Sequence, residues 1–312
     1  MIREIALNGF KSKLENSKNN YPQSTNPNAP RFFFNLLAVA SRGGSKTYTC
    51  TRLIKDFEEN NLIDNNGNKH PLRTFLISPT ISANKILRNL KSLEDEDMYE
   101  EYDDTVLKKI MDEIERTKEE VEKYKLYKNA YELIKRTPSN KIPDLMKRQP
   151  EIIKILEEYD FKHPNEIDIR FKEVPCNIIL LDDLMGSSAF NRKSQSLLTY
   201  YLIKNRHHFV SFFILVQSMK SVPKAIRTNC NVFLLGKFAS KKVVLEDMYE
   251  EVSNVLTEEQ FENLYDYATK DKYGCLIIDN SGESKRFYKS LDAELIVEDL
   301  VPHLTENKNN II

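Results

Sequence analysis

The sequence predicts an α/β protein with a mostly parallel central sheet that is flanked by helices and carries a charged helical insertion. Near-continuous apolar runs, typical of strands buried on both faces, alternate along the chain with helical patterns. Residues 82–160 differ from the rest because they are dense in Glu, Lys and Asp and contain no glycine. The chain has 312 residues, 40% of them hydrophobic, which is enough apolar material for a sizeable core.

The first predicted elements follow a polar leader. We expect residues 1–30 to be irregular, because they end in a stretch rich in Asn, Ser and Pro. Residues 31–40 (RFFFNLLAVA) are apolar and aromatic and predict a buried strand. A polar loop follows, and residues 46–57 then predict a helix. Residues 73–78 (RTFLIS) predict a second strand, which Pro79 ends.

The charged segment 82–160 predicts several helices, because its apolar residues recur at helical spacing. We expect breaks near Pro138, Pro143 and Pro150. Within the segment, residues 94–104 are strongly acidic. We interpret this run as a solvated helix face, with a nucleic-acid mimic or a regulatory tail as the alternatives. The segment as a whole is open to three roles: a lid, a contact between rings, or helices that flank the sheet.

Strand patterns return in the second half of the chain. The expected strands are 177–181, 209–216, 231–235, 273–279 and 286–288, with helices at 197–205 and two more within 241–270. Together these elements predict one domain over residues 31–304, interrupted by the insertion. Residues 305–312 are polar and predict a flexible tail.

Composition excludes several classes of protein. Lys and Arg total 46 and Asp and Glu total 47, so the net charge of −1 gives no overall attraction to nucleic acid or to an anionic membrane. Any contact with a polyanion must therefore come from a local patch. The four cysteines are scattered, which argues against a disulfide framework or a zinc site and favours a reducing compartment. No uncharged apolar run reaches the roughly 18 residues of a membrane helix, so we expect a soluble intracellular protein without a membrane span.

The loop after the first predicted strand is a candidate phosphate-binding loop. Residues 40–47 (ASRGGSKT) lie between a strand and a helix, where backbone N–H groups and a helix N-terminus attract phosphate. In the P-loop pattern G-x-x-x-x-G-K-[ST], the lysine reaches the β- and γ-phosphates and the hydroxyl ligates Mg²⁺. Here Lys46 and Thr47 take these places. The alternative is an ordinary glycine-containing turn before Lys-Thr.

Glycine usage bears directly on this loop. The chain has only 8 glycines, and Gly43 and Gly44 are their only adjacent pair. The pattern's two glycines are replaced by Ala40 and Ser45. We expect the inner pair to supply the backbone freedom instead. The predicted nucleotide-binding residues are Arg42, Gly43, Gly44, Ser45, Lys46 and Thr47.

Two further strand ends complete the candidate site. The strand at 177–181 runs into Asp182 and Asp183, at the carboxyl edge of the sheet next to the loop. We expect Asp182 to hold Mg²⁺ with Thr47, and Asp183 to polarise the attacking water. The alternative is that the two acids cap the next helix. The strand at 209–216 ends at Gln217, which we expect to lie between the acidic strand and the strand that precedes the phosphate loop. The alternative is that Gln217 is simply the first solvated residue after a strand.

Three segments then match one family: the phosphate loop, ILLDDLMG (179–186) and NRHHFVSFFILVQSMKSVPKAIRTN (205–229). The sequence resembles the genome-packaging ATPases of nucleocytoplasmic large DNA viruses, virophages and Polinton-like elements, which are P-loop motors of the FtsK/HerA class. The resemblance implies a P-loop NTPase fold and a homo-oligomeric ring that hydrolyses ATP with Mg²⁺ to drive double-stranded DNA into a capsid. It also implies a capsid or portal-vertex partner and a place in the host-cell cytoplasm, at viral assembly sites or in the virion.

The resemblance assigns roles at the matched positions. Lys46, Asp183 and Gln217 would act in catalysis, Thr47 and Asp182 would hold the metal, and Arg206 or Arg227 would serve as an arginine finger. Basic residues facing a ring pore would contact DNA without sequence preference, the candidates being Arg192, Lys193, Lys220 and Lys224.

Three alternatives remain open at this point. One is a terminase-like packaging motor without its nuclease domain, since such motors tolerate Ser or Ala before the lysine. Another is a P-loop kinase acting on a small substrate. The third is an assembly protein whose P-loop no longer hydrolyses nucleotide, which the substitutions at Ala40 and Ser45 suggest.

Overall fold

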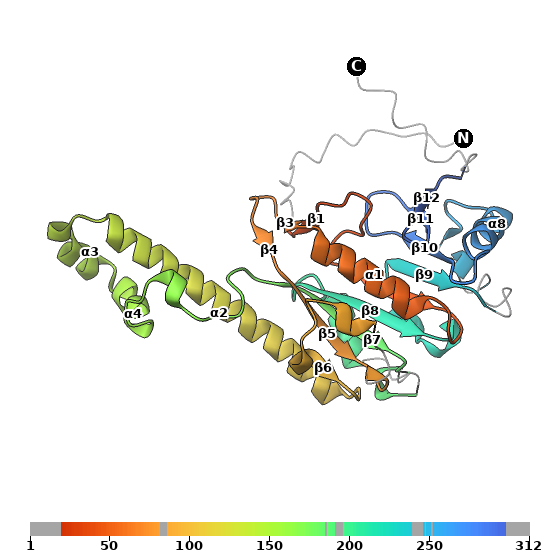
Figure 1. Ribbon diagram of the computed structural model, residues 1–312, viewed down its shortest axis with the longest axis horizontal. Helices are drawn as coiled ribbons and strands as arrows, with labels where there is room; N and C mark the ends of the chain where they lie inside the picture. The colour runs from red at the N-terminus through yellow and green to blue at the C-terminus, as the bar shows by residue number, and fades with distance from the viewer. Residues whose placement is uncertain are drawn as a thin grey trace, which may run out of the picture.

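The computed structural model describes residues 20–81, 86–184, 186–190, 196–238, 246, 248–250 and 252–297. Its main sheet has nine strands in the order β12-β11-β10-β9-β2-β8-β7-β5-β6 (Figure 1). The strands from β9 to β6 are parallel, whereas β10, β11 and β12 pair antiparallel. Their bounds are β2 (Asn35–Val39), β5 (Leu72–Ile77), β6 (Met98–Tyr99), β7 (Cys176–Asp182), β8 (Val210–Val216), β9 (Val232–Gly236), β10 (Cys275–Asp279), β11 (Arg286–Lys289) and β12 (Ala293–Leu295). The predicted fold class, a mostly parallel sheet flanked by helices, is confirmed.

The first predicted strand is shorter than expected. Residues 31–40 were expected to be extended throughout, but β2 begins only at Asn35. The three phenylalanines before it pack as an aromatic cluster, with the Phe32 ring 4.7 Å from Phe57 and the Phe34 ring 5.4 Å from Phe213. Aromatic residues that fill the space beneath a helix have the same apolar character as a buried strand, so their sequence does not distinguish the two.

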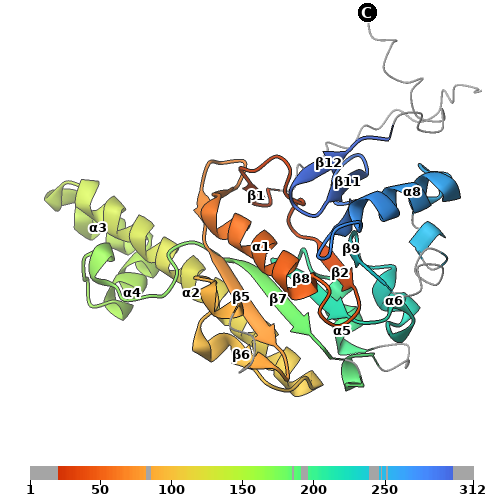
Figure 2. The same cartoon turned by 45° about the vertical axis from the view of Figure 1, so that its right-hand side comes forward.

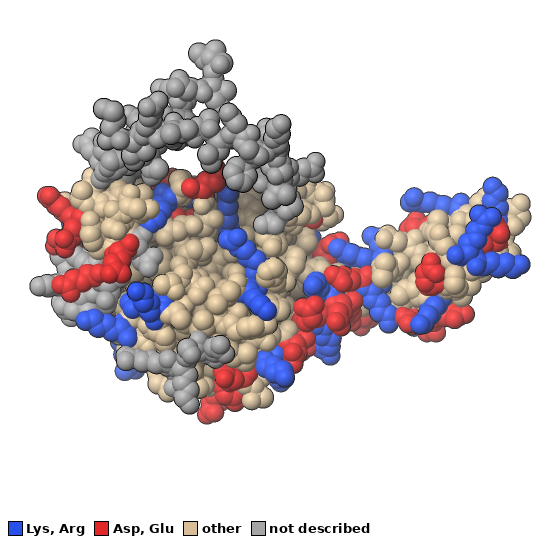
Figure 3. All heavy atoms as spheres, turned by 180° about the vertical axis from the view of Figure 1, so that it is seen from behind, with Lys and Arg blue, Asp and Glu red and all other residues tan. Residues whose placement is uncertain are grey.

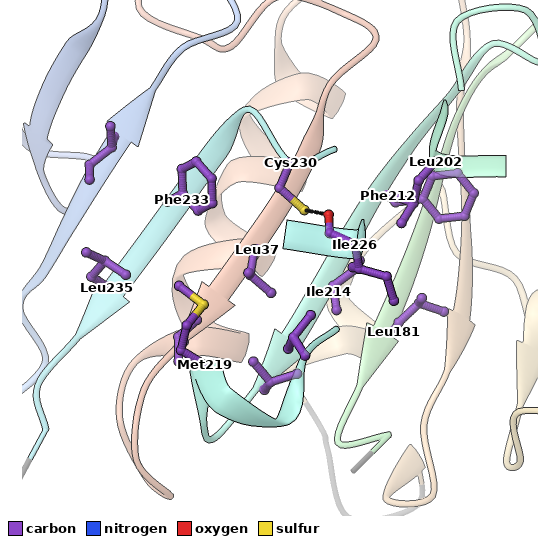
Figure 4. Close-up of a cluster of buried hydrophobic side chains, with 14 of the residues drawn as sticks. Leu37, Leu181, Leu202, Phe212, Ile214, Met219, Ile226, Cys230, Phe233 and Leu235 are labelled. Atoms are coloured by element: carbon purple, nitrogen blue, oxygen red, sulfur yellow. Dashed lines mark hydrogen bonds between the residues drawn. The ribbon is translucent and has the colours of Figure 1, made fainter. Parts of the chain in front are cut away.

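Helices cover both faces of the sheet (Figures 1 and 2). On one face lies α1 (Lys46–Glu59), which buries Cys50, Leu53 and Phe57 against alternate strand residues. On the other face lie the first half of α2 (Asp104–Arg136), α5 (Leu197–Ile203), α6 (Lys224–Arg227) and α8 (Glu258–Ala268). Figure 4 shows part of this second core, where Leu37, Phe212 and Phe233 from neighbouring strands point to the same side.

A helical arm projects from this body (Figures 1 and 2). We define the arm as residues 121–167: the distal half of α2, then α3 (Ile142–Arg148), α4 (Pro150–Glu158) and the segment that follows. It has a small core of its own, formed by Tyr124, Tyr127, Ala130, Ile152, Leu156 and Ile167. The predicted breaks are confirmed, because α2 ends at Arg136, before Pro138, and Pro143 and Pro150 lie in the first turns of α3 and α4. The boundaries 82–160 stay a prediction.

The acidic run at 94–104 is not the helix face that the sequence suggested. It contains a short 3₁₀ turn, the edge strand β6 and the residue that caps α2, since Asp103 accepts a hydrogen bond from the Val106 backbone at 2.7 Å. Within the run, Asp97 is buried and pairs with Arg73 of β5 at 2.7 Å. Arg73 also donates to Thr117 of α2 at 3.1 Å. This buried guanidinium therefore ties the sheet to the helix that carries the arm.

Replacing Arg73 should destabilise the protein strongly. In Arg73→Met we expect a loss of about 3 kcal/mol in the free energy of unfolding, because the buried carboxylate of Asp97 loses both hydrogen bonds from Arg73 and keeps only the one from Arg170. Urea denaturation followed by circular dichroism measures it. The matched control is Arg116→Met, which removes an exposed arginine that pairs with the same Glu113 as Arg73 and should leave stability unchanged. Equal stability of the two variants would contradict this account.

The ends of the chain are described only in part. From residue 20 onward, the predicted leader contains β1 (Gln23–Ser24), which pairs with β3 (Leu62–Ile63), and β3 pairs with β4 (Lys69–His70). Residues 1–19 and the predicted tail at 305–312 lie outside the described residues. Part of the stretch at 239–251 does too, but the described residues 246, 248–250 and 252 are helical and α8 follows them, in line with the two helices expected within 241–270. No helix among the described residues is long and apolar enough to cross a membrane.

Candidate active site

The sheet order brings the three predicted strand ends together. β8 lies between β2 and β7, as the sequence predicted for the strand that ends at Gln217. Because these strands are parallel, the loop after β2, the acids after β7 and Gln217 after β8 all meet at one edge. A cavity of about 750 Å³ opens there. It is lined by all six predicted nucleotide-binding residues and by Asp182, Asp183 and Gln217.

The backbone of the loop explains why two of its usual glycines are dispensable. The positive φ of the loop falls on Gly43, at +76°, whereas Ser45 has φ −16° and ψ 2° and leads directly into α1. Only a left-handed conformation favours glycine, and Ser45, with its negative φ, does not adopt it. The loop folds back through a hydrogen bond from Gly44 N–H to the Ser41 carbonyl at 3.0 Å. Gly43 therefore supplies the freedom that position 45 does not need.

Ala40 fits because two other positions carry no side chain. A Cβ at Gly236, on the neighbouring strand β9, would lie 2.5 Å from the Ala40 Cβ, and one at Gly44 would lie 3.1 Å from it. Real carbon atoms do not approach to 2.5 Å, and the surroundings are buried. The Ala40 methyl group, which the usual pattern lacks, thus fits because Gly236 on the neighbouring strand β9 has no side chain.

This contact predicts a rescue between two substitutions. Gly236→Ala should lower the free energy of unfolding by about 1–3 kcal/mol, because it adds a methyl group to a filled space. The double variant Ala40→Gly/Gly236→Ala removes the opposing methyl and should recover most of that loss. Chemical denaturation of the single and double variants measures both effects. If the double variant is no more stable than Gly236→Ala, the clash is not the cause.

Lys46 lies at the first position of α1 and is 7% exposed. Its Nζ donates to the Ala40 carbonyl at 2.6 Å and to the Ser41 carbonyl at 3.1 Å. Burial lowers the pKa of this ammonium, and the carboxylates of Asp182 and Asp183 oppose that shift. The loop thus holds its own lysine, inside the cavity and close to both acids.

Thr47 and Asp182 form the predicted metal pair. The Thr47 hydroxyl donates to Asp182 Oδ2 at 3.3 Å. Burial raises the pKa of Asp182, the hydrogen bond from Thr47 opposes the rise, and the charge of Asp183 adds to it. A hydroxyl and a carboxylate are hard oxygen donors, and Mg²⁺ is commonly held by one or two carboxylates together with substrate phosphates. This donor set fits Mg²⁺.

Asp183 and Gln217 form a second pair beside the first. Gln217 Nε2 donates to Asp183 Oδ1 at 3.0 Å, which links the end of β8 to the end of β7. Asp183 has φ +55°, a conformation that side chains other than Gly, Asn and Asp seldom adopt. Three residues later Gly186 has φ +90° and turns the chain away. Backbone conformations of this kind concentrate at functional sites, where the surrounding structure holds them.

Five cavity-lining residues were not predicted from the sequence, and three of them carry a hydroxyl group. Thr80 follows the carboxyl end of β5, so the same edge rule would have found it. Tyr48 and Tyr273 also line the cavity and are 52% and 57% exposed. Exposed rings beside a phosphate site can stack on a nucleotide base. Tyr273 precedes β10, which runs antiparallel to β9, and nothing in the sequence indicates that direction.

The predicted basic residues lie apart from one another. Arg206 is exposed and precedes β8, whose seven residues span about 23 Å, so it lies at the edge opposite the cavity. Arg227 ends α6, and its Nε atom is buried with no hydrogen-bond partner among the described residues. Lys220 and Lys224 are exposed in the segment that follows Gln217. Arg192 and Lys193 lie outside the described residues.

Comparisons with known proteins find similarity in structure only. No family model and no curated protein matches the sequence. The genome packaging NTPase B204 from Sulfolobus turreted icosahedral virus 2, in complex with AMP, is 8% identical, with a TM-score of 0.44 over 82% of this chain and 96% of that one. EssC (ATPases 2 and 3) from Geobacillus thermodenitrificans is 16% identical, with a TM-score of 0.38 over 68% and 34% of the two chains.

A third solved structure has a lower TM-score than these two. The N-terminal domain of zonular occludens toxin from Neisseria meningitidis is 11% identical, with a TM-score of 0.30 over 82% of this chain and 84% of that one. The chain is thus similar to structures that include a viral genome-packaging NTPase, the class that its sequence resembles. Similarities this remote assign it neither a family nor an activity.

Proposed function

We propose that the protein is an ATPase that uses Mg²⁺, and that the cavity at the carboxyl edge of its sheet is the active site. The observation that carries this proposal is the meeting of Lys46 and Thr47 with Asp182, Asp183 and Gln217 in one cavity. These residues supply a phosphate-binding loop, a pair of metal-binding oxygens and a polarising carboxylate. Lys46 and Thr47 follow β2, Asp182 and Asp183 lie at the end of β7, and Gln217 follows β8, so the ends of three neighbouring parallel strands supply the site that P-loop chemistry requires.

The residues divide the work as follows. The loop N–H groups and the α1 N-terminus hold the phosphates, and the Lys46 ammonium leaves the Ala40 and Ser41 carbonyls to bind phosphate oxygen. Thr47 and Asp182 hold Mg²⁺, which when bound neutralises charge on the phosphates. Asp183 accepts a proton from the attacking water, and the amide of Gln217 fixes the orientation of that carboxylate. Tyr48 and Tyr273 stack on the base.

We further propose that hydrolysis moves double-stranded DNA, as in viral genome packaging. The support is the sequence resemblance over residues 179–186 and 205–229, together with the exposure of Lys220 and Lys224 just after Gln217. A homo-oligomeric ring would repeat these lysines around a pore and contact phosphates without sequence preference. In such a ring Arg206 reaches a phosphate only from a neighbouring subunit, because it lies at the far edge of its own sheet. A capsid or portal-vertex protein at viral assembly sites in the host cell is the further partner.

The test is ATP turnover by the full chain with and without double-stranded DNA, together with the mass of the assembly in the presence of ATP. We expect turnover that double-stranded DNA of any sequence stimulates, by an assembly larger than a monomer. A strict monomer whose turnover is indifferent to DNA would contradict DNA translocation and favour a kinase. Tight nucleotide binding without turnover in any oligomeric state would favour a P-loop protein that does not hydrolyse.

A further inference from the structure

Charge is separated along the arm and its attachment. We define the arm root as residues 94–104, which contain eight Asp and Glu and no Lys or Arg. We define the arm tip as residues 128–154, which contain seven Lys and Arg against three Asp and Glu. Figure 3 shows basic side chains gathered on the outer part of the arm. The near-neutral total therefore hides two strongly charged regions of opposite sign.

The basic tip is open to a partner. Lys135, Lys141 and Lys147 are exposed, and none of them forms an ion pair within the described part of the chain. The two arginines of the tip pair only with residues four positions before them on the same helix. Pairs of this kind on a helix surface are weak and break readily.

The acidic root is only partly neutralised by its own subunit. Arg170 pairs with Glu94, Glu96 and Asp97, and Arg73 holds Asp97 as well. Asp95, Glu100 and Glu101 are exposed, and the described ion pairs include none of the three. The root therefore presents unneutralised carboxylates beside the short edge strand β6.

The two regions are separated by about the width of a subunit. The root lies at the start of α2, and the tip occupies its far end together with α3 and α4. The 33 residues of α2 span about 50 Å. A globular body of roughly 230 residues has a diameter of about 45 Å. Copies placed side by side with this spacing would bring the tip of one close to the root of the next.

An apolar groove of the arm, lined in part by residues of the tip, favours a protein partner over DNA. The groove runs between α2 and α4, encloses about 470 Å³ and contains Leu126 and Leu133, which are 63% and 41% exposed. A DNA backbone offers phosphate and sugar to such a surface, whereas a neighbouring protein can bury the leucines.

We propose that the arm tip of one subunit docks on the arm root of the next copy of this chain, as a head-to-tail contact. The two surfaces differ, so each subunit binds one neighbour through its arm tip and the other neighbour through its arm root. Head-to-tail contacts of this kind close into a ring when the copies are related by a suitable rotation. This proposal rests on the ring of the proposed function and identifies the surfaces through which its subunits would touch. Charge also orients the encounter of two subunits. Two basic tips repel each other, and so do two acidic roots, whereas a tip and a root attract.

Charge exchange tests the contact. The tip variant is Lys135→Glu/Lys141→Glu/Lys147→Glu, and the root variant is Asp95→Lys/Glu100→Lys/Glu101→Lys. Asp97 and Asp103 are left intact, because they hold Arg73 and cap α2. The control Lys55→Glu/Lys69→Glu/Lys270→Glu matches the charge change of the tip variant at exposed positions outside the arm. Sedimentation of the full chain with ATP gives the assembly constant, and thermal melting confirms that each variant is folded.

We expect each of the two single-region variants to assemble roughly 30-fold more weakly than wild type. The six-residue charge-exchanged variant should recover most of the loss, and the control should assemble like wild type. If the tip variant assembles normally but loses affinity for DNA, the docking contact is wrong and the tip is a DNA surface. Weak assembly of the six-residue variant would also overturn the pairing. If the wild-type protein stays monomeric, the ring itself is wrong. That result differs from one in which the wild type assembles and the arm variants do so equally well, which would reject only the arm contact.

Discussion

Asp183→Asn should nearly abolish ATP hydrolysis while leaving nucleotide binding intact. Asparagine keeps the size and the Oδ1 atom of aspartate, so it can still accept the hydrogen bond from Gln217. It also tolerates the positive φ at this position as well as aspartate does. What it lacks is a group that accepts a proton from water. Removing a positioned base of this kind costs about 10²- to 10⁴-fold in kcat.

Single-turnover phosphate release measures this effect, and titration with a fluorescent ATP analogue measures binding. The control is Glu59→Gln, which neutralises an exposed carboxylate at the last position of α1, away from the cavity, and should leave both quantities unchanged. A kcat for Asp183→Asn within a few fold of wild type would remove Asp183 from the mechanism. Asp182 would then be the remaining candidate for the group that accepts a proton from water.

Lys46→Ala should weaken nucleotide binding roughly 100-fold, because charge-assisted hydrogen bonds to phosphate contribute about 1.5–3 kcal/mol each. The substitution also removes contacts within the loop itself. Without the ammonium, the carbonyls of Ala40 and Ser41 lose the donor that holds them. The loop should therefore be less ordered before nucleotide arrives, which adds an entropic cost to binding.

Isothermal titration with ATP and Mg²⁺ measures the affinity, and hydrogen exchange over residues 40–45 measures the order of the loop. Lys55→Ala on the same helix is the control, because its side chain is exposed and pairs with Glu59 away from the cavity. Unchanged affinity in Lys46→Ala would mean that the cavity is not a phosphate site. Unchanged exchange would mean that the lysine does not order the loop.

Local sequence pattern was enough to predict most of the sheet and the centre of the site. Buried parallel strands are apolar along their whole length, so β5, β7, β8 and β9 stand out in the sequence. Since parallel strands share a carboxyl edge, the convergence of Lys46, Asp182 and Gln217 followed from their places alone. No contact had to be known to make that prediction.

What the sequence did not reveal depends on contacts between distant segments. The Arg73–Asp97 pair joins a strand to an acidic run that looks like an exposed surface, and only the fold buries it. Tyr273 reaches the cavity because β10 runs antiparallel to its neighbour. The clustered phenylalanines before β2 resembled a strand because hydrophobicity indicates that a side chain is buried. It does not indicate whether the side chain packs in a sheet or against a helix.

The close approach of Ala40 and Gly236 also constrains how this chain could have arrived at its sequence. While position 40 is alanine, position 236 cannot accept a side chain without a clash. An ancestor with a side chain at 236 would have had to lose it before the methyl group at 40 could be tolerated. The cost of each substitution therefore depends on the other. Once Ala40 is present, a larger residue at 236 lowers stability unless 40 reverts first.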